Sequence, residues 1–194
     1  MSAKINVVNY ALSLLGANPI TSLEDDAHEA KVMKTFYYEA RDGLLETVEW
    51  SFAIKRFNPA KSTDEPLWGW SSAFPIPSDI LRVLTVESDN TYGMNRDQVD
   101  HVVEQRSILC NEDNFVCTGI RRIDDEGVYS PLFNEAFAVK LAVLACLAIT
   151  ESNTKFQQMA AMYAGVIKEA KSRDGQQGTT RRVRSRWINR ARQR

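Results

Sequence analysis

Apolar residues recur every three or four positions near the start of the chain, which is the spacing of one helix face. This spacing predicts a helix over residues 5–15, ended by Gly16. It predicts a second helix over about residues 27–48, in which Gly43 costs about 1 kcal/mol relative to alanine and permits close helix packing. The buried stripe of this second helix is expected to be Ala30, Met33, Tyr37, Ala40, Leu44 and Val48.

The same period returns in the last third of the chain. Ser130 and Pro131 are typical of a helix start, because serine caps the first turn and proline fits its first position. The helix that follows, to about Thr150, is apolar on nearly every side, which predicts the central helix of a bundle. A fourth helix begins at Ser152 and is expected to end at residues 173–175.

Between the second and third helices the helical period is absent. Six of the twelve Trp and Phe residues lie within residues 50–74, and four prolines between residues 59 and 77 exclude long helices there. We interpret the cluster at residues 68–70 (WGW) as the hydrophobic joint between strands and helices; a platform for stacking sugars or bases is the alternative. Aliphatic and β-branched runs predict strands over residues 80–86, about 99–109 and 115–123, joined by polar turns as an antiparallel meander.

The predicted fold is therefore α+β and mainly α, a four-helix bundle with an antiparallel β meander inserted between its second and third helices. Residues 1–50 and 130–174 form the bundle, residues 51–129 form the β insertion, and residues 175–194 form a flexible, extended C-terminal arm. No apolar run reaches the length of about 20 residues that a membrane span needs, so no membrane is predicted.

Charge divides the chain into two opposed parts. The segment from Gly175 onward carries +7, whereas the preceding 174 residues carry 17 basic and 25 acidic side chains, a net of −8. Such an asymmetry is typical of a terminal arm that binds something outside its own domain. The arm can bind nucleic acid through its charge, bind an acidic protein surface, or serve only as a solvated tail.

Two apolar residues within the arm favour protein docking. Trp187 and Ile188 interrupt the arginines, and tryptophan and arginine are the residue types that dominate protein–protein hot spots. The predicted partner-binding residues are Arg181, Arg182, Arg184, Arg186, Trp187, Ile188, Arg190 and Arg192.

Candidate ligands and nucleophiles are few. Cys110, Cys117 and Cys146 have no zinc-binding spacing, so we expect inert thiols in a reducing compartment. His28 and His101 belong to no metal-binding motif and are expected to be an exposed helix-start residue and a strand residue. Phosphate-binding glycine motifs are absent, and no cofactor or metal is predicted.

Acidic residues occur in two runs, residues 24–26 and residues 124–126. Two carboxylates that converge across a cleft would suit glycoside hydrolysis, with Glu24, Asp25 or Asp125 as candidates. Acids in predicted loops are usually solvated, so we predict no enzyme and keep a glycan hydrolase as an alternative.

Four segments, in this order and spacing, resemble the head-to-tail adaptor proteins of tailed bacteriophages, also called tail tubular protein A or head-completion proteins. They are residues 5–26 (INVVNYALSLLGANPITSLEDD), 50–56 (WSFAIKR), 66–86 (PLWGWSSAFPIPSDILRVLTV) and 101–142. None of them is a catalytic fingerprint.

The resemblance implies a structural virion protein, made in the host cytoplasm, that forms a dodecameric ring at the head–tail junction. Such a ring joins the portal protein to the next tail component, a nozzle or tail tube, and extends the DNA channel without binding DNA specifically. In this family the C-terminal segment reaches the portal, although the arm of this chain is more basic than in many relatives. Nucleic-acid binding through the arm is one alternative function, and a tail-associated glycan hydrolase is the other.

Overall fold

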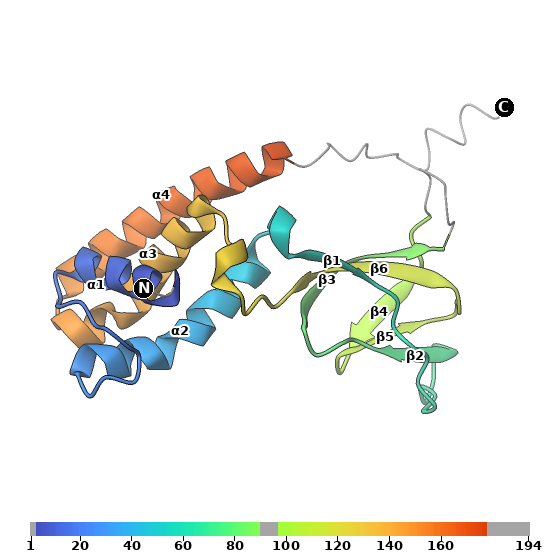
Figure 1. Ribbon diagram of the computed structural model, residues 1–194. Coiled ribbons are helices and arrows are strands. Elements are labelled where there is room, and N and C mark those ends of the chain that lie inside the picture. Colours follow the sequence, from blue (N-terminus) through green and yellow to red (C-terminus); the bar gives the residue numbers. More distant parts are fainter. Residues whose placement is uncertain (1–2, 90–96, 178–194) are drawn as a thin grey trace.

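The computed structural model describes residues 3–89 and 97–177, which form four α-helices and two small antiparallel sheets. The helices lie together at one side of the molecule and the sheets at the other (Figure 1). The mixed class of the fold is as predicted.

The four predicted helices are present. They are α1 (Ala3–Leu15), α2 (His28–Thr47), α3 (Pro131–Thr150) and α4 (Asn153–Gln177). Because α4 extends to Gln177, the first three residues of the arm predicted to begin at Gly175 are helical.

Helix α3 packs against each of the other three helices. Ser130 Oγ caps it by accepting a hydrogen bond from the Phe133 amide at 3.2 Å, as expected from the sequence. By length and composition α3 could cross a membrane, contrary to the expectation that no run is long enough. Its place among three helices, with 50% of the apolar stretch buried, accounts for this composition in a core helix.

The first sheet has the order β1-β6-β3, in which β1 (Ile54–Phe57) and β3 (Ile80–Ser88) both pair antiparallel with β6 (Phe115–Arg121). The central strand is thus the last of the β segment in the chain. The prediction of a meander, in which successive strands are neighbours, is wrong for this sheet.

The second sheet has the order β2-β5-β4, with β2 at Ser72–Pro75, β5 at Ser107–Cys110 and β4 at His101–Glu104. The strand predicted over residues 99–109 is therefore two strands. The chain reverses at Gln105 and Arg106, whose φ angles are +46° and +60°. Tight hairpins need such angles and usually place Asn or Gly there, so this turn carried no sequence signal.

Two apolar cores follow from this arrangement. The large one lies among the helices and includes all six residues of the predicted α2 stripe. The small one, which includes Phe74 and Phe115 in edge-to-face contact at 4.7 Å, joins residues of both sheets.

The joint between helices and sheets is built around Trp50. This side chain is fully buried, its Nε1 donates to the Leu44 carbonyl at 3.0 Å, and its ring meets that of Phe133 edge-on at 5.0 Å. Phe52 packs on Trp50 and Phe133. The joint is therefore made by the first aromatic residues of the cluster, and the prediction that it lies around Trp68 is wrong.

Candidate docking sites

The predicted partner-binding residues, Arg181 to Arg192, lie outside the described residues. The structure does describe the base of the arm, at the end of α4. Both carboxylate oxygens of Asp174 accept hydrogen bonds from Ser51, one from its amide at 2.9 Å and one from its hydroxyl at 3.1 Å. Ala170, one turn earlier, is fully buried. The last turn of α4 is thus attached to the segment that leads into β1, and the arm leaves from a fixed point.

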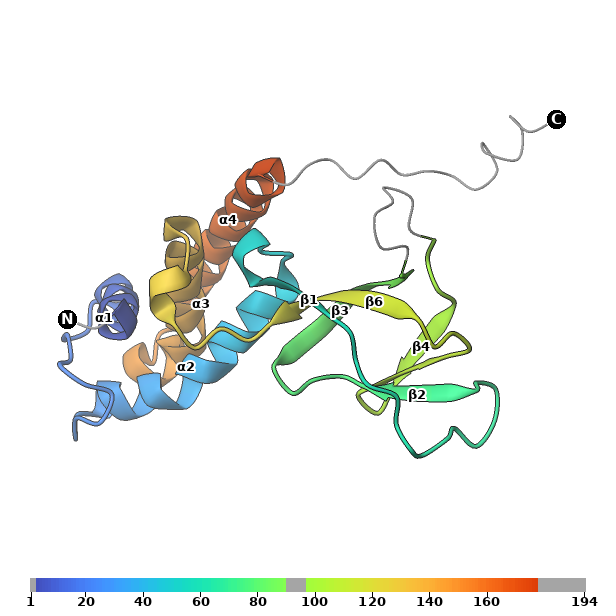
Figure 2. The same cartoon turned by 45° about the vertical axis from the view of Figure 1, so that its right-hand side comes forward.

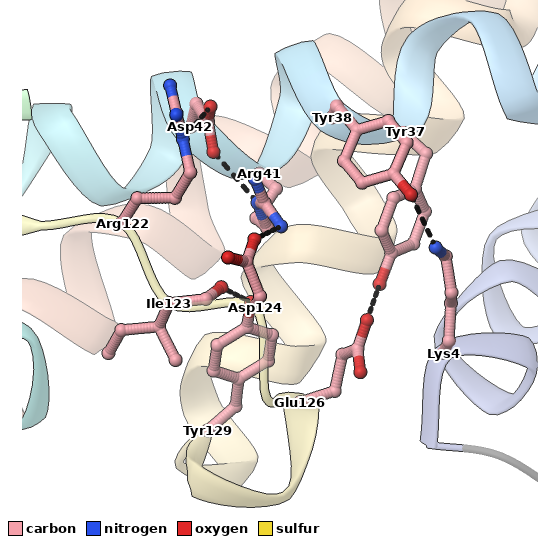
Figure 3. A network of polar contacts seen from close by, with 10 residues as sticks. All are labelled: Lys4, Tyr37, Tyr38, Arg41, Asp42, Arg122, Ile123, Asp124, Glu126 and Tyr129. Carbon is pink, nitrogen blue, oxygen red and sulfur yellow. Dashed lines mark hydrogen bonds and ion pairs between the residues drawn. The ribbon is translucent and has the colours of Figure 1, made fainter. Parts of the chain in front are cut away.

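A polar network holds the helices to the segment that follows β6 (Figure 3). Arg41 on α2 is only 3% exposed, and its guanidinium donates to Asp42 at 2.8 Å and to Asp124 at 2.7 Å. Asp42 also accepts from Arg122 at 2.9 Å. Burial opposes the charge of Arg41, but the hydrogen bond to Asp42 and the negative charges of Asp42 and Asp124 outweigh it and raise the pKa of the guanidinium. The ion therefore ties two distant parts of the chain together.

The network continues toward α1. The Tyr37 hydroxyl donates to Glu126 at 3.1 Å, and Lys4 on α1 donates to the Tyr38 hydroxyl at 2.9 Å (Figure 3). Burial, followed by the charge of Glu126, raises the pKa of Tyr37 far above its usual value. Tyr129 donates to the Ile123 carbonyl at 2.7 Å. These contacts stiffen the junction of α1, α2 and the β6–α3 connection.

The acids considered for catalysis in residues 124–126 have structural partners. Asp124 pairs with Arg41, Glu126 accepts from Tyr37, and Asp125 accepts from the Gly127 amide at 2.9 Å. Their contacts explain the fold of the β6–α3 connection without a substrate.

The other acidic run is likewise engaged. Asp25 accepts from the amides of Ser22 and Thr21, and these hydrogen bonds lower its pKa. Glu24 pairs with Lys34. A general acid needs the opposite shift, a raised pKa, so Asp25 is poorly suited to that role.

A pocket of about 330 Å³ in the β part is lined mainly by aliphatic residues, and its polar lining residues, Arg82, Gln105 and Arg106, include no carboxylate. It therefore does not bring together the two acids that a glycosidase needs. Arg106 already donates to the carbonyls of Pro77 and Ile80.

The candidate metal ligands are also separated. His28 hydrogen bonds to the Ala148 carbonyl and His101 to the Val99 carbonyl, while Cys110, Cys117 and Cys146 are buried and free. In residues 3–89 and 97–177, no three His, Cys, Asp or Glu side chains converge as a metal site would require.

A surface that the sequence interpretation kept only as an alternative, an exposed platform at residues 68–70, lies in the loop of residues 58–71, between β1 and β2. Leu67 is 100% exposed and Trp68 is 85% exposed. Gly69, with φ of +84°, turns the chain directly after them. The bracketing of Leu-Trp by Pro66 and Gly69, with no strand or helix period around it, was the available signal for an exposed turn.

Comparison of the chain with protein-family models and with curated protein sequences gives no match.

Proposed function

We propose that this protein is a structural component of a phage virion, a head-to-tail adaptor that joins the portal to the tail and extends the DNA channel. The observation that carries the proposal is the division of charge: an arm of +7 follows a body of −8. Arm residues 181–194 bind an acidic face of the portal, with Trp187 and Ile188 as apolar anchors. No enzymatic step is required for this role.

The attachment of α4 supports the arm's role. A segment that orders on binding pays a cost in conformational entropy, which is smaller when one end is already held. The contact of Asp174 with Ser51 holds that end three residues before Gln177, the last described residue of α4.

The joint supports the role of a connector. A protein that connects two assemblies needs its helices and its β segment to be held firmly to one another. Trp50 packs the segment that leads from α2 into β1 against Phe133 of α3, and Arg41 binds Asp124 in the segment that leads from β6 to α3. In this proposal, α1 to α4 form one bundle, with the β segment inserted between α2 and α3.

The acidic body fits a ring with DNA in its lumen. Phosphates are repelled by a surface of the same sign, so DNA passes without being held. The next tail component, a nozzle or tail tube, binds the ring on the side away from the portal. The ring is dodecameric and belongs to the head–tail junction of the virion.

The proposal is tested by mixing the purified chain with the portal protein encoded by the same genome and imaging the mixture by electron microscopy. We expect a ring of this chain on the portal. A chain ending at Gln177 keeps its circular dichroism spectrum and melting temperature but does not bind. Portal binding by the truncated chain at full-length affinity contradicts the role of the arm.

One double variant separates charge from apolar anchoring and distinguishes portal binding from nucleic-acid binding. Trp187→Ala with Ile188→Ala keeps all seven arginines and is expected to weaken portal binding while leaving weak DNA binding unchanged. If the arm is instead a DNA-binding element, affinity for a DNA duplex falls with salt with a log–log slope of about −6 for seven charges. That result, together with no portal binding, supports the alternative function.

A further inference from the structure

The loop of residues 58–71, here called the Trp68 loop, exposes a large apolar surface for a folded protein. Its tip presents Leu67 at 100% and Trp68 at 85% exposure. Single exposed aliphatic residues are common, but adjacent exposed Leu and Trp side chains are typical of interaction sites. Neither residue contributes to either core of the described structure.

Contacts at both ends of the loop fix its base. The Ser62 amide donates to the Ala73 carbonyl on β2 at 2.8 Å. The Ser71 amide donates to Asn111 Oδ1 at 2.9 Å. Gly69 adopts a left-handed φ of +84°, with no atom near the position of a Cβ. The tip is thus presented on an anchored loop, which lowers the entropy cost of binding.

Acidic residues precede the tip in the chain and lie in the turn at the base of the loop. Asp64 and Glu65 precede it, and Glu112 lies in the turn that contacts the loop through Asn111 and through the ion pair of Lys61 with Asp113. Within the described part of the chain, Asp64, Glu65 and Glu112 form no ion pair. Their charge repels phosphate and so disfavours nucleotide stacking on Trp68. It complements a protein surface with lysine or arginine around an apolar pocket.

The Trp68 loop lies away from the base of the arm. In Figures 1 and 2, which are related by rotation about the vertical axis, α4 ends at the upper side of the molecule. The loop leading into β2 lies at the lower side in both views. A partner on the loop therefore need not compete with a partner on the arm.

We propose that the Trp68 loop inserts Leu67 and Trp68 into an apolar pocket, rimmed by basic residues, on the next tail component. This inference rests on the proposed adaptor function. It assigns binding of the next tail component to the surface opposite the base of the portal-binding arm. Burial of a tryptophan at the centre of an interface is typical of a hot spot.

The test measures binding of the tail protein encoded by the same genome to the preassembled portal–adaptor complex. The variant Leu67→Ala with Trp68→Ala is compared with Leu147→Ala, which alters a 47% exposed leucine on α3. The loop variant is expected to raise the Kd for the tail protein at least about 30-fold, the effect of losing one hot spot. Asp64→Asn with Glu65→Gln is expected to raise the Kd severalfold at low salt and little at high salt. Leu147→Ala is expected to bind as the wild type does.

The outcomes distinguish this inference from the proposed function. A wild-type ring on the portal whose tail binding is unchanged by the loop variant overturns the inference and leaves the function in place. Loss of the ring itself in the loop variant, with its fold retained, assigns the loop to a contact between copies and also overturns the inference. A wild-type chain that binds neither portal nor tail protein refutes both.

Discussion

Arg41 provides a quantitative test of how the helices are held to the β6–α3 connection. The substitution Arg41→Met replaces the charged side chain by a flexible, unbranched apolar one. It deletes the hydrogen bonds to Asp42 at 2.8 Å and to Asp124 at 2.7 Å.

The exposure of the remaining carboxylates sets the magnitude. Removing one partner of a fully buried ion pair costs about 3–5 kcal/mol, because the other charge is stranded away from water. Here the side chain of Asp124 is 80% exposed and that of Asp42 is 25% exposed. Asp42 also keeps Arg122 as a partner. Water replaces much of what is lost, so Arg41→Met is expected to lower the free energy of unfolding by about 2 kcal/mol.

The two aspartates should not be equivalent. Asp42→Ala strands Nε of a guanidinium whose side chain is only 4% exposed, and is expected to cost about 2 kcal/mol or more. Asp124→Asn keeps an acceptor at an exposed position, and is expected to cost less than about 1 kcal/mol. The control Arg173→Met removes an exposed i,i+4 pair with Glu169 and is expected to cost about 0.5 kcal/mol or less.

Urea unfolding at pH 7, followed by circular dichroism and by tryptophan fluorescence, measures all four variants. The reasoning is refuted if Arg41→Met costs no more than Arg173→Met, or if Asp124→Asn costs as much as Asp42→Ala. Coincidence of the two probes shows that helices and β segment unfold together, as the shared network requires.

Three further predictions use the same unfolding measurement. Gly43→Ala is expected to stabilise the protein by up to about 1 kcal/mol, because alanine has the higher helix propensity. The added Cβ would meet Lys140 Nζ at 2.8 Å, which is the end of a flexible side chain that can move aside. A loss of stability would show that Lys140 cannot move. Asp174→Ala is expected to cost about 1 kcal/mol and to speed amide exchange in the last turn of α4, whereas unchanged exchange would mean that Ser51 does not hold that turn. Burial raises the pKa of the Cys117 thiol to about 12, so the neutral thiol contributes fully to stability below the unfolded pKa of about 8.5, and this contribution is lost as the pH rises toward 12. Cys117→Ala should therefore reduce the fall in the free energy of unfolding between pH 8 and pH 10. An unaltered slope of that free energy against pH contradicts this account.

The helices could be predicted because their signals are local. The apolar period of α2 and the Ser130-Pro131 start of α3 both lie within a few residues of the structure that they specify. The strands β1 and β2 have four residues each, too few for an alternating pattern to stand out. Their pairing with residues 32 to 66 positions away in the chain depends on tertiary contacts that no local period encodes.

The same distinction between local and distant contacts explains the candidate sites. Glu126 and Asp124 resemble solvated or catalytic acids in the sequence because their partners, Tyr37 and Arg41, are 89 and 83 residues away. Trp50 and Trp68 carry the same side chain in the same aromatic-rich segment, yet one is fully buried and the other 85% exposed. Composition alone cannot separate such cases.

What separates them is whether the fold supplies a partner. Trp50 has the Leu44 carbonyl and the ring of Phe133, so its large apolar area stabilises the joint. Trp68 lies outside both cores, on a loop whose base is nevertheless fixed by hydrogen bonds. Since Trp68 adds no packing energy to the folded chain, its place on a fixed loop is best explained by burial against a partner. This argues for a second docking surface besides the arginine arm.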